Sequence, residues 1–151
     1  MKVAGTGHRP EDAEAENVVR LKARVKLRYS PADCFISGMA AGFDLWAADE
    51  AILLGMEVIA AVPWRGHEPR KGDEDLYNRV LGHASRVVYV TDTEEFPGPK
   101  AYHKRNHWMV DNADAVLAYL NPEKESGGTY ECVKYARGRK PVANIWFDPP
   151  F

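Results

Sequence analysis

The sequence contains only two cysteines, Cys34 and Cys132, which excludes a disulfide scaffold and a cysteine-based zinc cluster. It has no apolar run long enough to span a membrane, and its first residues, MKVAGTGHRP, lack the apolar core of a signal peptide. A formal net charge of −2 argues against a protein whose affinity comes mainly from a basic surface. We therefore expect a cytoplasmic protein with reduced thiols, without membrane or nucleic-acid partners.

Familiar catalytic signatures are also missing. The chain has neither a G-x-S-x-G nucleophile elbow nor the lysine of a Walker phosphate loop, which disfavours acyl transfer and nucleoside triphosphate hydrolysis. His103, His107 and Asp111 recur every fourth residue, a spacing seen in metal sites, but no further ligand motif accompanies them. A solvated helix face has the same pattern, and we expect no metal.

The chain does have a regular alternation of short apolar runs with longer amphipathic segments, in a length that suits one domain over residues 1–151. We expect strands at residues 2–5, 34–37, 57–62, 86–91, 115–120 and 141–146. We expect helices at residues 13–28, 44–54, 74–84, 101–112 and 129–138. The apolar runs VIAAV and DAVLAYL indicate strands buried on both faces. The pattern predicts a three-layer α/β sandwich around a mostly parallel sheet.

The stretch SGMAAGFD, residues 37–44, follows an expected strand and opens an expected helix. Gly38 and Gly42 allow the backbone to approach a ligand closely, and the free N–H groups of a helix N-terminus favour an anion such as phosphate. An ordinary turn that needs glycine for geometry alone has the same sequence. The loop therefore indicates a nucleotide site only if other loops agree.

Other loops at the carboxyl ends of the expected strands carry similar chemistry. They are GTGHRP at residues 5–10, PWRGHE at 63–68 and the stretch from Asn121 to Thr129. Ligands of open α/β sheets bind at this edge, so these loops are expected to meet there. The long irregular segment of residues 92–100 has no phosphate chemistry, and we interpret it as a solvated loop and not a lid.

The residue types in these loops suggest roles. Gly127, Gly128 and Thr129 open a helix and offer N–H groups and a hydroxyl to a phosphate. Arg9 and Arg105 would clamp phosphate oxygens, unless they form surface salt bridges.

Three further side chains are candidates for contact with the ligand. Trp64 and Trp46 would stack on a base, or Trp46 would pack in the core. Asp44 would bind a ribose hydroxyl or cap the helix that it begins.

The sequence resembles the YpsA-like branch of the SLOG superfamily. The resemblance rests on GTGHRP, SGMAAGFDLWAADEA, Tyr102 through Arg105 and Asn106, Asp111, DAVLAYL and GGTYE, in the family's order over nearly the whole chain. It implies a Rossmann-like fold that binds nucleotides or nucleotide-derived ligands, including ADP-ribose-like and NAD-related molecules. The DNA-processing protein DprA is a looser likeness, and it implies single-stranded DNA binding as one alternative.

The superfamily also contains the LOG phosphoribohydrolases, which hydrolyse the N-glycosidic bond of nucleoside monophosphates. Their P-G-G-x-G-T-x-x-E motif is not matched by the segment from Ser126 to Glu131, which lacks the proline and shifts the acid. Glu131 therefore does not carry over as a catalytic residue. N-glycosidase activity remains an alternative, with Glu131, Asp44 or Glu68 as its acid, and whether the protein is an enzyme stays open.

We expect a homo-oligomer that binds a small nucleotide ligand as a sensor or sequestering module, with no certain cofactor and no assigned catalytic residue. The expected ligand-binding residues are Gly5, Thr6, Gly7, His8, Arg9, Ser37, Gly38, Met39, Ala40, Gly42, Asp44, Trp64, Arg105, Asn106, Gly127, Gly128 and Thr129.

Overall fold

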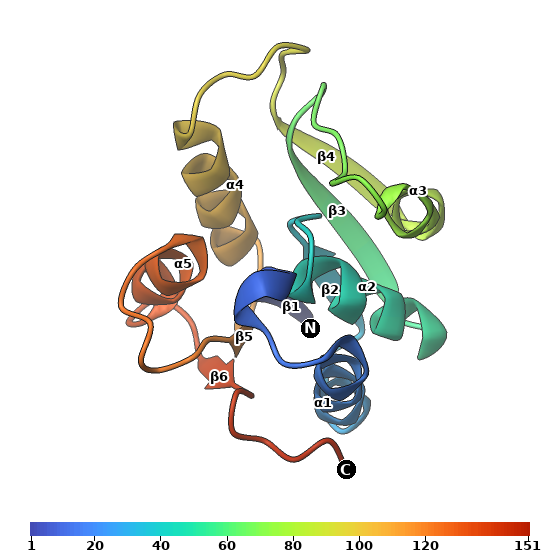
Figure 1. The fold of residues 1–151 in the computed structure, drawn as a ribbon, viewed down its shortest axis with the longest axis vertical. Helices are drawn as coiled ribbons and strands as arrows, with labels where there is room; N and C mark the ends of the chain where they lie inside the picture. Colours follow the sequence, from blue (N-terminus) through green and yellow to red (C-terminus); the bar gives the residue numbers. More distant parts are fainter.

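Six parallel strands form a single sheet in the order β4-β3-β2-β1-β5-β6 in the computed structural model, which describes residues 1–151 (Figure 1). The strands are β1 (Lys2–Gly7), β2 (Cys34–Ser37), β3 (Glu57–Trp64), β4 (Arg86–Thr91), β5 (Ala115–Tyr119) and β6 (Val142–Asn144). The helices are α1 (Glu16–Arg28), α2 (Phe43–Leu53), α3 (Glu74–His83), α4 (Lys100–Asp111) and α5 (Gly128–Ala136).

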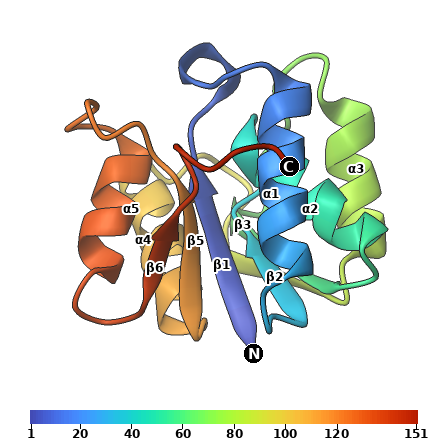
Figure 2. The same cartoon turned by 90° about the horizontal axis from the view of Figure 1, so that it is seen from below.

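The helices form two layers. Helices α1, α2 and α3 cover one face of the sheet, and α4 and α5 cover the other (Figures 1 and 2). Each layer closes its own apolar core, one around Phe35, Phe43 and Leu45 and the other around Ile36 and Met109. The three-layer Rossmann-like sandwich is confirmed, with a sheet that is parallel throughout.

The element boundaries follow local chemistry. Strands β2 and β4 have the expected bounds, whereas β1 and β3 each run two residues further, to Gly7 and Trp64. The first helix begins at Glu16 and not at residue 13, because Pro10 starts a separate 3₁₀ turn, Pro10–Asp12. No helix is long and apolar enough to cross a membrane.

Strand β1 lies where the direction of the chain reverses. It pairs with β2 on one side and with β5 on the other, and the link from β4 through α4 carries the chain past β1 to β5. The carboxyl ends of all six strands point the same way, because every neighbouring pair is parallel. The loops after β1 and β5 therefore part at a topological switch point, where open α/β sheets bind their ligands.

Candidate functional site

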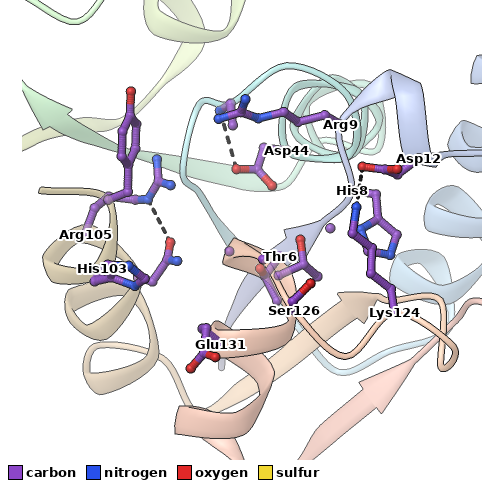
Figure 3. A pocket seen from close by; sticks show the side chains of 18 of the residues that line it. Thr6, His8, Arg9, Asp12, Asp44, His103, Arg105, Lys124, Ser126 and Glu131 are labelled. Atoms are coloured by element: carbon purple, nitrogen blue, oxygen red, sulfur yellow. Dashed lines mark hydrogen bonds and ion pairs between the residues drawn. The ribbon is translucent and has the colours of Figure 1, made fainter. Parts of the chain in front are cut away.

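A cavity of about 580 Å³, the first cavity, lies at this switch point. Side chains converge on it from the loop after β1, from the start of α2, from α4 and from the start of α5 (Figure 3). Its lining residues are Gly5, Thr6, Gly7, His8, Arg9, Asp12, Ala40, Asp44, Pro99, Tyr102, His103, Arg105, Asn106, Lys124, Ser126, Gly127, Gly128, Thr129 and Glu131. The lining combines charged and hydrogen-bonding side chains with glycines, which suits a polar or charged ligand.

The structure brings most of the expected site residues to this cavity. The loop after β1, the pair in α4 and the start of α5 all line it. Five expected residues do not line it: Ser37, Gly38, Met39, Gly42 and Trp64. Lys124, Asp12 and Tyr102 line the cavity but were not among the expected ligand-binding residues.

The N-terminus of α5 presents unpaired donors. Gly127 has φ +98°, and its carbonyl accepts the first helical hydrogen bond, which the N–H of Glu131 donates. No side chain caps this helix, so the N–H groups of Gly128, Thr129 and Tyr130 lack protein acceptors. Three such donors at a positive helix end form an anion site in many α/β proteins.

The N-terminus of α2 is different, because a carboxylate of the chain already lies there. Oδ2 of Asp44 accepts a hydrogen bond of 3.4 Å from the N–H of Ala40. Ser37 is fully buried, and its hydroxyl donates to the carbonyl of Asp44. Gly42, with φ +86°, lets the chain pass close to the carbonyl of His8. Asp44 does not cap α2, since no side chain does and Ala40 precedes the helix, but its carboxylate lines the cavity and leaves this helix end less room for an external anion.

Burial governs the ionisation of Asp44. Loss of solvent raises the pKa of its carboxyl to about 6, although the Arg105 guanidinium and two backbone N–H groups favour the charged form. The side chain is only 7% exposed. Asp44 consequently exchanges its proton closer to neutral pH than an ordinary aspartate does.

Arg105 is held by the protein and does not form a surface salt bridge. Its Nη1 donates to the carbonyl of Gly38 at 2.5 Å, and its Nε donates to Oδ1 of Asn106 at 2.9 Å. Only 6% of the residue is exposed. Burial lowers the pKa of this guanidinium, but arginine stays charged at any physiological pH. Arg105 is thus a rigidly held cation in the wall of the cavity.

Gly38 owes its identity to these two neighbours. A Cβ atom there would lie 2.9 Å from Oδ2 of Asp44 and 3.1 Å from Cδ of Arg105. Its φ is not positive, and Met39 is the non-glycine residue with the left-handed conformation, at φ 65°. Glycine at position 38 therefore provides room for the buried charges.

His8 joins the two loops that flank the switch point. Its Nε2 accepts a hydrogen bond of 2.8 Å from the N–H of Asn121, and its ring contacts Tyr119 and Trp146 edge-on. Burial is the main cause that lowers the pKa of this imidazole, and Lys124 adds to it. His8 therefore stays neutral, with Nε2 as an acceptor, and supports the wall of the cavity.

Lys124 and Asp12 form an ion pair across the mouth of the cavity, with Nζ 2.6 Å from Oδ2 (Figure 3). They come from the loop before α5 and from the 3₁₀ turn after β1. The one sequence signal for Lys124 was its position just before the glycine pair, in a loop already expected to contact a phosphate. No feature of the sequence around Asp12 indicated that it would line the cavity.

Trp46 and Trp64 have structural roles in the core and between aromatic rings. Trp46 packs in the core around Leu45 and is 7% exposed. Trp64 ends β3 and is 8% exposed, and its ring meets His67, Phe96 and Tyr102 edge-on. Trp64 therefore orients other rings and is not part of the first cavity.

The histidine series on α4 has other partners. His107 stacks on the ring of Tyr135 at 3.8 Å, and Asp111 accepts a hydrogen bond from the Tyr135 hydroxyl. No group of three or more His, Cys, Asp or Glu side chains is arranged to hold a metal ion.

A family model matches most of the chain. The model of the YpsA family, described as the YspA SLOG family, matches residues 20–145. A UPF0398 protein of Bacillus velezensis is 27% identical over 124 residues, which cover 75% of this chain and 67% of that protein. The UPF0398 protein YpsA of Bacillus subtilis is 28% identical over 102 residues, covering 63% of this chain and 56% of that protein. This chain thus spans only part of the length of either relative.

Solved structures share the fold at low identity. DNA processing protein A from Helicobacter pylori, whose single-stranded DNA binding was studied, has a TM-score of 0.68 at 17% identity. That match covers 94% of this chain and 63% of the other. The protein TM1055 has a TM-score of 0.61 at 16% identity, covering 93% of this chain and 71% of the other. At these identities the similarity establishes the fold alone.

Proposed function

This chain belongs to the YspA SLOG family, and we propose that it binds a nucleotide or nucleotide-derived ligand, such as a nucleoside phosphate or an ADP-ribose-like molecule, in the first cavity. In this proposal the chain acts as a sensor or sequestering module and performs no reaction on the ligand.

The observation that carries the proposal is the set of unpaired N–H groups of Gly128, Thr129 and Tyr130 at the start of α5. Gly128 and Thr129 line a cavity that Arg9 and Arg105 line as well. Backbone donors at a helix end together with guanidinium groups are the usual means of binding phosphate. The remaining polar lining supplies partners for ribose hydroxyls.

A thermal-shift series tests the proposal. ADP-ribose, NAD and nucleoside mono- and diphosphates are added to the protein at millimolar concentration. A ligand at 100 times its dissociation constant stabilises the folded state by about 2.7 kcal/mol. For a domain of this size the melting temperature then rises by roughly 5 to 10 °C. If every nucleotide leaves the melting temperature unchanged, the proposal is wrong.

A second candidate is nucleoside monophosphate N-glycosidase activity. The observation in its favour is that the carboxyl groups of Asp44 and Glu131 line the same cavity, together with Asp12, which is paired with Lys124. The raised pKa of Asp44, about 6, would suit a general acid. Release of free base and ribose phosphate from AMP distinguishes this candidate from a binding protein.

Single-stranded DNA binding, the property studied in the Helicobacter pylori relative in fold, is tested separately with oligonucleotides. It would show as an affinity for oligonucleotides that falls steeply with salt. The net charge of −2 gives it no support.

A further inference from the structure

A second cavity of about 230 Å³ adjoins the first. The two share Arg9, Ala40, Tyr102 and Arg105 in their walls, so a ligand in one can continue into the other. The second cavity has a mixed lining, in which Met39, Ala41, Leu45 and Pro69 lie together with His67, Glu68 and Arg70.

Tyr102 and His67, which line the second cavity, are both fixed by Trp64. The ring of Trp64 meets His67 at 5.0 Å and Tyr102 at 5.5 Å between centroids, nearly perpendicular in both cases. The guanidinium carbon of Arg105 lies 5.8 Å from the centre of the Tyr102 ring. Rings held in this way offer apolar contact at little cost in conformational entropy.

His67 gives the second cavity an uncharged polar group. Its Nδ1 lies 2.9 Å from the hydroxyl of Tyr77, and its Nε2 has no partner in the protein. Burial lowers the pKa of His67 to about 4, so the imidazole is neutral at physiological pH. The neutral imidazole offers a hydrogen-bonding partner to the edge of a heteroaromatic ring, and the Tyr102 ring and the guanidinium groups of the lining offer partners for its face.

We propose that the second cavity binds the nucleobase of a nucleotide whose phosphates bind in the first cavity. The inference rests on the proposed function and narrows its ligands to those that carry a base. Arg9 and Arg105 lie in the shared wall, between the phosphates and the base.

The test compares ligands with and without a base. Calorimetry measures AMP against ribose 5-phosphate, and ADP against pyrophosphate, on the wild-type chain. The base-containing member of a pair should bind at least about tenfold more tightly, as expected for one stacked base. Equal affinity within the pairs would overturn the inference while leaving phosphate binding intact.

Two substitutions locate the base. Ala41→Trp narrows the second cavity without touching the first, because Ala41 lines only the second. We expect the preference for AMP over ribose 5-phosphate to fall to about twofold or less, with ribose 5-phosphate affinity unchanged. Tyr102→Ala should reduce the same preference, whereas Tyr102→Phe should keep it.

Tyr29→Ala is the matched control, since Tyr29 is 81% exposed and lines neither cavity. Melting temperatures confirm that each variant is folded. A preference for AMP that survives both Ala41→Trp and Tyr102→Ala would place the base elsewhere and refute the inference. Failure of the wild-type chain to bind any of the four probes would instead refute the proposed function, and the inference with it.

Discussion

Asp44 and Arg105 both lie where a Cβ atom of residue 38 would be, close enough that this single atom would touch both, yet they form no direct ion pair. Each satisfies its charge partly through the backbone, Asp44 at Ala40 and Arg105 at Gly38. The two opposite charges are therefore buried at the cavity wall without neutralising each other at contact distance. A polar ligand there meets both signs of charge in fixed positions.

The first prediction concerns Gly38. Gly38→Ala should destabilise the fold by about 1 to 3 kcal/mol, since the new methyl group displaces Asp44 and Arg105. Gly82→Ala in α3 is the matched control, because a Cβ there meets nothing within 4 Å, and it should stabilise by about 0.5 to 1 kcal/mol. Urea unfolding measures both. A Gly38→Ala protein as stable as the wild type would mean that the site has more room than described.

The second prediction is a pH dependence due to Asp44. Its pKa is about 6 in the folded chain, above the ordinary value of 3.8, so the folded state holds a proton that the unfolded state has lost. The contribution of Asp44 is greatest below pH 4 and is lost as the pH rises through 6. Asp44→Asn cannot ionise, so the variant does not lose this stability as the pH rises. The stability of the variant relative to the wild type should therefore rise by on the order of 2 to 3 kcal/mol between pH 4 and pH 7.

The comparison with Asp44→Asn is essential because His67 acts in the opposite direction. Its pKa is lowered to about 4, so its contribution is lost as the pH falls below 6.5. The wild-type curve contains both effects, and the difference between the two proteins isolates that of Asp44. Urea unfolding at several pH values provides the data, and a constant difference would contradict the raised pKa.

The third prediction concerns His8. His8→Phe retains an aromatic ring against Tyr119 and Trp146 but leaves the N–H of Asn121 without an acceptor. We expect a loss of about 1 to 3 kcal/mol in unfolding free energy. Amide exchange at Asn121 should also become faster, because the link between the two loops is broken. Unchanged exchange at that amide would show that another group holds the loop.

The fourth prediction concerns chemistry at Glu131. Its side chain is exposed in the first turn of α5, where a carboxylate stabilises the helix through the dipole. We expect the protein to release negligible free base from AMP or CMP, and Glu131→Gln to cost about 0.3 to 1 kcal/mol of stability. Chromatography of the reaction products measures turnover. Steady release of base that Glu131→Gln abolishes, with the fold intact, would establish the N-glycosidase candidate instead.

Much of the fold could be predicted because buried parallel strands have a simple signature. Runs such as VIAAV have no polar alternation, and the carboxyl ends of the strands gather the loops at one edge. Helix starts were less certain, as at Glu16, because a proline-initiated turn has the same acidic residues as a helix start.

The details of the site could not be predicted from local patterns. The pairing of Lys124 with Asp12 joins residues 112 positions apart, and the contact of Gly38 with Arg105 joins the loop after β2 to α4. Trp64 looked like a loop residue, but it is the last residue of β3 and buried. Such contacts depend on how the layers pack, which no single segment specifies.

The switch point between β1 and β5 also separates the two helical layers. Asp44 comes from the layer on one side of the sheet, whereas Arg105, Asn106 and the start of α5 come from the other. A molecule bound between them contacts both layers and restrains their movement relative to each other. The mechanical coupling between layers is then set by the occupant of the cavity as well as by the sheet.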